Sequence, residues 1–103
     1  VTSEMGRKPK IGDPRSGGVS GAGRDHWTAC QSVLLAGGGI RGGQTFGKTD
    51  PRAEYPVENV MGPENIAHTV YHAMGIDDLT AIDSGGRPFN ILEKGRPLTE
   101  LFG

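Results

Sequence analysis

The chain has 103 residues, which is enough for one small domain. Its net charge of −1 argues against a general role on nucleic acids or membrane surfaces. No apolar run approaches the roughly 18 residues of a membrane span, and the single cysteine, Cys30, excludes an intrachain disulfide.

The composition predicts a loop-rich chain with a small core. Hydrophobic residues make up 34% of it, and 18 Gly with 7 Pro account for about a quarter. The opening residues 1–3 are typical of the end of a strand already under way. We therefore expect residues 1–103 to be the C-terminal fragment of one larger domain, which needs its missing N-terminal part for stability and activity.

The first half of the chain predicts one long loop and two strands. Residues 6–23 are rich in Gly, Pro, Lys and Arg, which predicts a surface loop of a length that is often functional or mobile. Residues 32–36 form an apolar run that stops at three glycines, which predicts a strand covered on both faces. Weak alternation predicts a second, exposed strand near residues 44–48.

A helix over residues 63–74 is the best local prediction. Pro63 suits the first helical position, and Gly75 suits a left-handed C-terminal cap. Ile66 and Val70 recur at helical spacing, so we expect both to be buried. After the helix we expect a turn, a short edge strand and a small apolar plug, at residues 84–88, 89–92 and 98–102.

Two glycine-rich segments match nucleotide-binding motifs in the wrong context. Residues 42–49 fit G-x-x-x-x-G-K-[ST], but a phosphate loop must open a helix, and Pro51 and Pro56 leave no room for one. We expect a hairpin with an exposed Lys48 there. Residues 37–42 fit G-x-G-x-x-G, yet no helix signal follows, so these glycines predict a turn.

The most informative segment is residues 23–27 (GRDHW). Asp25 and His26 offer a carboxylate and an imidazole, donors that suit a divalent metal ion or acid–base chemistry. A lone Asp-His pair is also commonly structural, so both interpretations stay open. Glu4 is a second candidate carboxylate, with a solvated loop side chain as its alternative.

His68 and His72 are four residues apart and share one face of the predicted helix. This spacing can bind zinc, but no H-E-x-x-H glutamate lies between the two histidines. We therefore interpret them as part of a half-buried helix face.

Several short motifs, in this order, resemble a known family. Residues 3–7 (SEMGR), 23–27, 32–43, 47–50 and 63–77 resemble the C-terminal part of the uncharacterised sulfatase-like bacterial family related to the alkaline phosphatases. The resemblance implies an α/β fold, in which this chain is the C-terminal portion of an alkaline-phosphatase-like α/β sandwich with a mixed central sheet. It also implies an exported, periplasmic location.

The resemblance implies a metal site at Glu4, Asp25 and His26, with zinc, calcium or magnesium as the ion. Met5 stands where the family has an imidazole, and a thioether is a poor ligand for such ions. No catalytic nucleophile is assigned within this chain. Arg7 and Arg24 are the expected substrate-binding residues, since paired N–H donors suit an anionic ester.

Three functions follow as expectations. The first is the C-terminal portion of a metal-dependent hydrolase of sulfate or phosphate esters, whose partners are its own N-terminal part and an anionic small-molecule or polymer ester. The second is a non-catalytic binding or structural member of the same fold. The third is a nucleotide-binding protein that uses residues 42–49.

Overall fold

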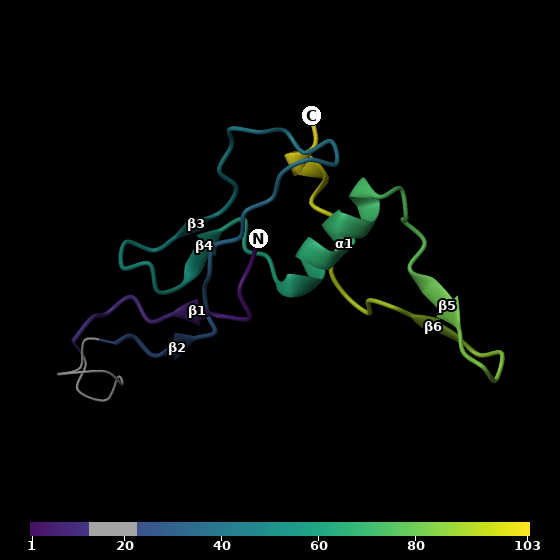
Figure 1. Cartoon of the computed structure of the whole chain (residues 1–103), viewed down its shortest axis with the longest axis horizontal. Coiled ribbons are helices and arrows are strands. Elements are labelled where there is room, and N and C mark those ends of the chain that lie inside the picture. Colours follow the sequence, from purple (N-terminus) through teal and green to yellow (C-terminus); the bar gives the residue numbers. More distant parts are fainter. Residues whose placement is uncertain (13–22) are drawn as a thin grey trace. The chain divides into compact units, whose positions relative to one another are not determined.

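The computed structural model describes residues 1–12 and 23–103. The chain divides into two compact units, each built from two separate stretches of sequence (Figure 1). Unit 1 comprises Val1–Leu35 and Thr45–Val60, and unit 2 comprises Ala36–Gln44 and Met61–Gly103. Within the described residues, no helix is long and apolar enough to cross a lipid bilayer.

Unit 1 contains two short antiparallel strand pairs. Strand β1 (Gly6–Arg7) pairs with β2 (His26–Trp27), and β3 (Lys48–Thr49) pairs with β4 (Pro56–Glu58). The loop predicted over residues 6–23 therefore begins with strand β1 and ends just before strand β2. Its residues 13–22 lie outside the part of the chain that the structure describes.

Trp27 ties the two strand pairs of unit 1 together. Its indole N–H donates a hydrogen bond of 2.6 Å to the backbone carbonyl of Glu54, in the loop between β3 and β4. Its ring also meets the Tyr55 ring edge-on, with 5.6 Å between the ring centroids. An aromatic side chain with a polar N–H can supply both contacts at once.

Helix α1 (Pro63–Ala73) in unit 2 confirms the predicted helix. At its start, the Asn65 side-chain oxygen accepts a 2.9 Å hydrogen bond from the Gly62 N–H. At its end, Gly75 has a φ of +79°, and the N–H groups of Gly75 and Ile76 bond back to the carbonyls of His72 and Tyr71. These two hydrogen bonds together form a Schellman motif, which satisfies backbone carbonyls at the end of the helix that have no partner within it.

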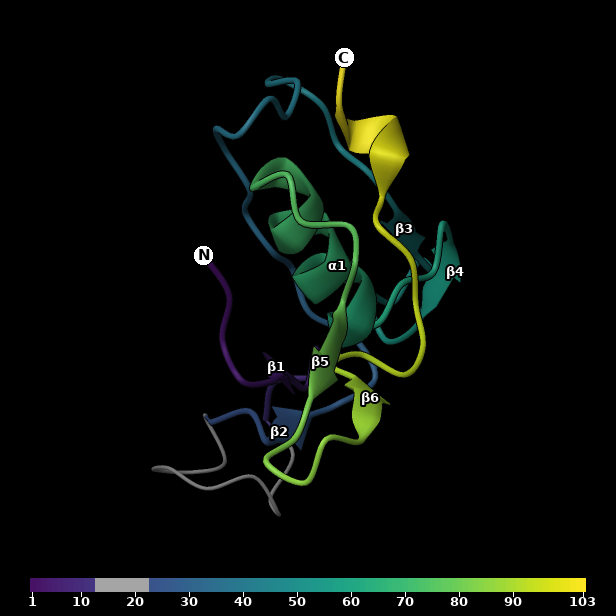
Figure 2. The same cartoon turned by 90° about the vertical axis from the view of Figure 1, so that its right-hand side faces the viewer.

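The rest of unit 2 is a hairpin and a C-terminal segment. Strand β5 (Thr80–Ile82) pairs antiparallel with β6 (Pro88–Asn90), and the Asp83 carboxylate accepts backbone N–H bonds that close the turn between them. After β6, the chain runs back alongside α1 and ends in a short 3-10 helix, η2 (Thr99–Leu101), as Figure 2 shows. The predicted turn and apolar plug are confirmed, and the strand predicted at residues 89–92 forms at Pro88–Asn90.

The C-terminal segment is fixed to α1 by a buried hydroxyl. Thr69 is 1% exposed, and its Oγ1 accepts a 2.9 Å hydrogen bond from the Leu98 N–H. The same hydroxyl donates to the Asn65 carbonyl at 2.6 Å. The Asn65 side chain also donates a hydrogen bond of 3.1 Å to the Arg96 carbonyl. Two hydrogen bonds therefore fix the position of this segment along the helix.

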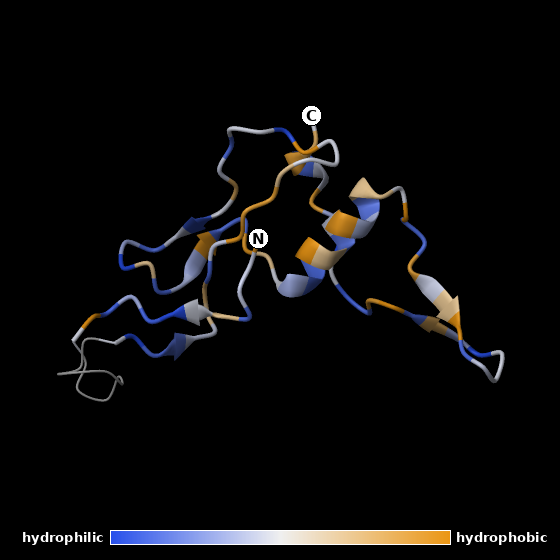
Figure 3. Cartoon of the chain, viewed as in Figure 1, coloured by the Kyte–Doolittle hydropathy of each residue, from blue (hydrophilic) through white to orange (hydrophobic). Residues whose placement is uncertain are grey.

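The core is small, as the composition predicts. Among the described residues, the buried apolar side chains are Leu79, Leu98 and Leu101. Figure 3 shows other apolar residues on α1, on β4 and β5, and in the loops that connect the elements. Val70 is 46% exposed, so the prediction that it is buried is wrong. Val70 does lie in the predicted helix, but the C-terminal segment covers the helix at Thr69 and leaves Val70 exposed.

The predicted strand at residues 32–36 is wrong, because no strand forms there. Leu34 exchanges backbone hydrogen bonds with Val1, but it is 66% exposed, and a single bonded pair does not make a ladder. The strand predicted near 44–48 overlaps β3 only at Lys48. The described elements are three small antiparallel sheets and one α-helix, and the larger α/β sandwich stays a prediction.

We expect Thr69→Val to lower the free energy of unfolding by about 1–3 kcal/mol, because it leaves the buried Leu98 N–H without an acceptor while keeping the side-chain shape. Denaturant unfolding of the two proteins measures the difference. Val70→Ala is the matched control on the exposed side of the helix, with an expected change within about 0.5 kcal/mol. Equal losses in the two variants would contradict this account of the core.

The Arg96–Glu100 pair makes a second prediction, which concerns pH. The Arg96 guanidinium binds both carboxylate oxygens of Glu100, at 2.8 and 3.2 Å, and these hydrogen bonds hold the pKa of Glu100 below its ordinary value. Because the folded pKa is the lower one, the pair contributes stability above the ordinary carboxyl pKa and loses it as the pH falls through the folded pKa.

Carboxyl NMR titration of Glu100 measures this pKa directly. In Arg96→Gln we expect the pKa of Glu100 to rise toward its ordinary value, and in Arg87→Gln, which removes a different exposed pair with Asp83, we expect no change. A Glu100 pKa that is the same with and without Arg96 would rule the pair out as the cause.

Candidate functional site: a cationic face on strands β1 and β2

The β1–β2 pair brings together two motifs that lie about 20 residues apart in the sequence. Arg7 is directly opposite His26, and Gly6 is opposite Trp27. A further backbone bond of 2.8 Å, from the Lys8 N–H to the Asp25 carbonyl, continues the ladder beyond β1 and β2. Arg7 and His26, one predicted site residue from each motif, therefore meet on this small sheet, whose strands β1 and β2 lie side by side in Figure 1.

Three of these side chains share one face of the sheet. Arg7 shares a face with His26, because the two are opposite each other in the sheet. Arg24 lies just before β2, and the alternation of exposed and half-buried residues over 24–27 places it with His26. The burial pattern agrees: Arg7, Arg24 and His26 are exposed, whereas Asp25 and Trp27 are half-buried. We call Arg7, Arg24 and His26 the cationic face.

The cationic face keeps most of its donors available. The Arg7 guanidinium donates one hydrogen bond, of 3.2 Å, to the backbone carbonyl of Arg24. Among the described residues, no carboxylate forms an ion pair with Arg7, Arg24 or His26. Since each guanidinium carries five N–H donors, the face can donate several hydrogen bonds to one oxyanion.

The opposite face of the sheet holds the arrangement in place. Trp27 is on that side and is bound to the β3–β4 loop through Glu54. Gly6 lets β1 come close to the backbone that follows β2, because a Cβ at this position would lie 2.0 Å from the Cys30 carbonyl oxygen. The sheet therefore packs through one face and leaves its charged residues on the other.

The metal centre predicted at Glu4, Asp25 and His26 has no group of three ligands to support it among the described residues. In the part of the chain that the structure describes, no three His, Cys, Asp or Glu side chains are grouped to hold a metal ion. Asp25 directly precedes β2 and is half-buried, whereas His26 is exposed. Glu4 lies three residues before the position opposite His26. The zinc, calcium or magnesium ion stays a prediction.

The phosphate-loop match at residues 42–49 does not have phosphate-loop geometry. Lys48 and Thr49 form β3, and residues 49–56 are non-helical, as predicted. A turn follows, in which one Asp50 carboxylate oxygen accepts the N–H groups of Arg52 and Glu54. No helix N-terminus is therefore available here to hold a phosphate.

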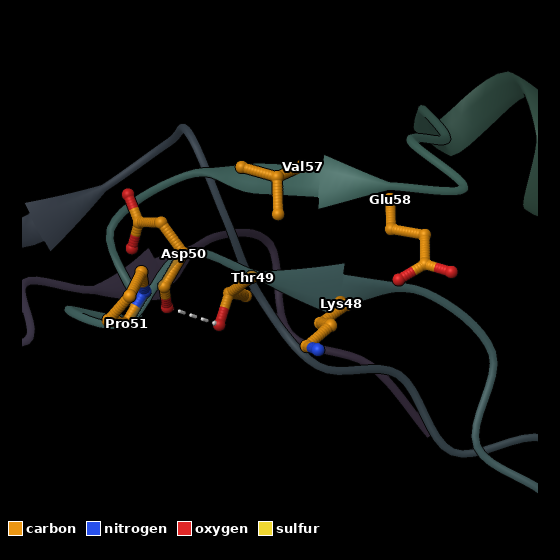
Figure 4. Close-up of a pocket in the computed structure, with 6 residues that line it drawn as sticks. All are labelled: Lys48, Thr49, Asp50, Pro51, Val57 and Glu58. Atoms are coloured by element: carbon orange, nitrogen blue, oxygen red, sulfur yellow. Dashed lines mark hydrogen bonds between the residues drawn. The ribbon is translucent and has the colours of Figure 1, made fainter.

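Figure 4 shows what occupies this segment instead. Lys48 and Glu58 come from facing positions of β3 and β4, and they border an open depression. Its other lining residues are Thr49, Asp50, Pro51 and Val57. The glycines at 37–39 all have positive φ and form a turn, as the sequence predicted.

Sequence reasoning named Arg7, Arg24 and His26 but missed that they share a face. The missing information was the register of β1 against β2, which depends on contacts between residues that are far apart in the sequence. The two-residue spacing of Arg24 and His26 was the available signal, because it places both side chains on one face of any strand.

We expect Gly6→Ala to disrupt the β1–β2 pair, because the new methyl group would overlap the Cys30 carbonyl oxygen. Loss of the cross-strand nuclear Overhauser effects between Arg7 and His26 would show this. Gly42→Ala is the matched control, since a Cβ there meets no atom within 4 Å. An unchanged β1–β2 pair in Gly6→Ala would mean that the two segments do not approach so closely.

One family model, described as "Protein of unknown function (DUF1501)", matches residues 1–102. Neither a curated protein nor a solved structure matches the chain. The resemblance to the sulfatase-like relatives of alkaline phosphatase is therefore wrong, because no sulfatase or alkaline phosphatase family is found. The order of several short motifs along the chain was not sufficient evidence to identify the family. The chain belongs to the DUF1501 family.

Proposed function

We propose that this chain binds the anionic group of a sulfate or phosphate ester on its cationic face. The observation that carries the proposal is the placement of Arg7, Arg24 and His26 on the exposed face of the β1–β2 sheet. The chain has a net charge of −1, so attraction of an anion would come from this local cluster.

The residue types suit a tetrahedral oxyanion. A guanidinium is always charged, and its planar fork of donors matches two oxygens of a sulfate or phosphate group. An imidazole adds one N–H donor when neutral and two when protonated. Arg7 is already turned along the face toward Arg24, through its bond to the Arg24 carbonyl.

We further propose ester hydrolysis as the reaction that this face serves. In such a reaction, Arg7 and Arg24 would hold the ester and stabilise the negative charge that grows on its oxygens in the transition state. The second candidate is a binding protein without catalysis. This second candidate is favoured because the exposed arginines of the cationic face supply binding donors while no catalytic nucleophile is assigned to this chain.

The test is binding of inorganic phosphate, sulfate and 4-nitrophenyl phosphate, measured by calorimetry. We expect Arg7→Gln and Arg24→Gln each to weaken binding about tenfold or more, because each removes a charged donor. Arg52→Gln is the matched control, since Arg52 is exposed in the same unit but lies in the β3–β4 loop.

Equal binding by all four proteins would overturn the anion-binding proposal. Release of 4-nitrophenol separates the two candidates: turnover that Arg7→Gln abolishes supports the hydrolase, and binding without turnover supports the non-catalytic protein.

A further inference from the structure

His68 and His72 have hydrogen bonds that fix which nitrogen of each ring is free. His68 Nε2 lies 3.0 Å from the Lys94 carbonyl oxygen, and His72 Nδ1 lies 2.6 Å from an Asp77 carboxylate oxygen. Both oxygens only accept, so each of these ring nitrogens is the N–H donor. In the neutral imidazoles the lone pairs are therefore on His68 Nδ1 and His72 Nε2.

This hydrogen-bonding pattern is the one that metal-binding histidines show. A histidine that binds a metal ion through one ring nitrogen almost always donates its other N–H to a carboxylate or a backbone carbonyl, which fixes the ring and its tautomer. His68 has the carbonyl and His72 has the carboxylate. Two histidines of one short helix thus meet this condition independently.

The helix places the two histidines on the same face. Residues four apart on an α-helix have Cβ atoms roughly 5–6 Å apart, which is compatible with two nitrogens that each lie about 2 Å from one ion. Both side chains are half-buried, so part of their rotamer freedom is already lost. The Phe102 ring packs edge-on against His72, with 5.1 Å between the centroids, and restricts that ring further.

We propose that His68 and His72 form a binding site for one divalent transition-metal ion, such as Zn²⁺. Imidazole nitrogen suits zinc, copper and nickel, and it does not suit magnesium or calcium. The described residues offer no group of three protein ligands, so water completes the coordination. The site uses residues of unit 2 alone and does not depend on the proposed anion binding by unit 1.

The test is titration of the chain with ZnCl₂ by calorimetry, and with NiCl₂ by NMR of the histidine side chains. We expect one saturable zinc ion per chain, and paramagnetic broadening of His68 and His72 by nickel. His68→Gln and His72→Gln should each weaken zinc binding at least tenfold. Asp77→Asn, which keeps both ligands, should weaken it about 10–100-fold, since it removes the carboxylate that orients His72.

His26→Gln is the matched control, because His26 is the one other histidine of the chain besides His68 and His72. It should leave zinc binding unchanged, and it should weaken phosphate binding if the proposed function is correct, so the two proposals fail separately. Far-UV circular dichroism checks that α1 persists in every variant. Absence of saturable zinc binding, or zinc binding that survives in His68→Gln and His72→Gln, would overturn the metal site.

Discussion

The hydrogen bond from the Leu98 N–H to the buried Thr69 hydroxyl is the contact on which unit 2 depends. A buried hydroxyl is costly unless it is bonded, and this one is satisfied in both directions, since it also donates to the Asn65 carbonyl. With so few buried apolar side chains, hydrophobic burial alone specifies the position of the C-terminal segment weakly. The polar contact fixes it, and so determines which carbonyl reaches His68 and which ring reaches His72.

Unit 1 is organised by a comparable pair of constraints. Trp27 binds the β3–β4 loop, and Gly6 allows close approach to the backbone at Cys30. Both contacts use the same side of the β1–β2 sheet. Because a strand alternates its side chains, commitment of that side to packing leaves Arg7, Arg24 and His26 on the exposed side. The candidate site is therefore a consequence of how the sheet packs.

The sequence predicted the limits of the helix correctly, because they depend on nearby residues. It did not predict which distant segments pair with or cover one another. The limits of α1 follow from Pro63 and Gly75, whose backbone preferences act within a few residues. The exposure of Val70 could not be predicted in this way, because it depends on where residues 94–102 cover the helix. Likewise, the apolar run at residues 32–36 has the composition of a strand, but within residues 1–12 and 23–103 its backbone bonds are to Val1 alone.

The candidate site illustrates the same division. Asp25 and His26 are neighbours in sequence, which suggested a shared metal ion, but Asp25 is half-buried just before β2 whereas His26 is exposed on it. The alternation that separates Asp25 from His26 also places His26 beside Arg24, and the pairing with β1 adds Arg7. The metal ion predicted for Asp25 and His26 stays a prediction, and what the structure adds is the pairing of Arg7 with His26. The anion binding that we propose for this cluster therefore depends on the register of β1 against β2.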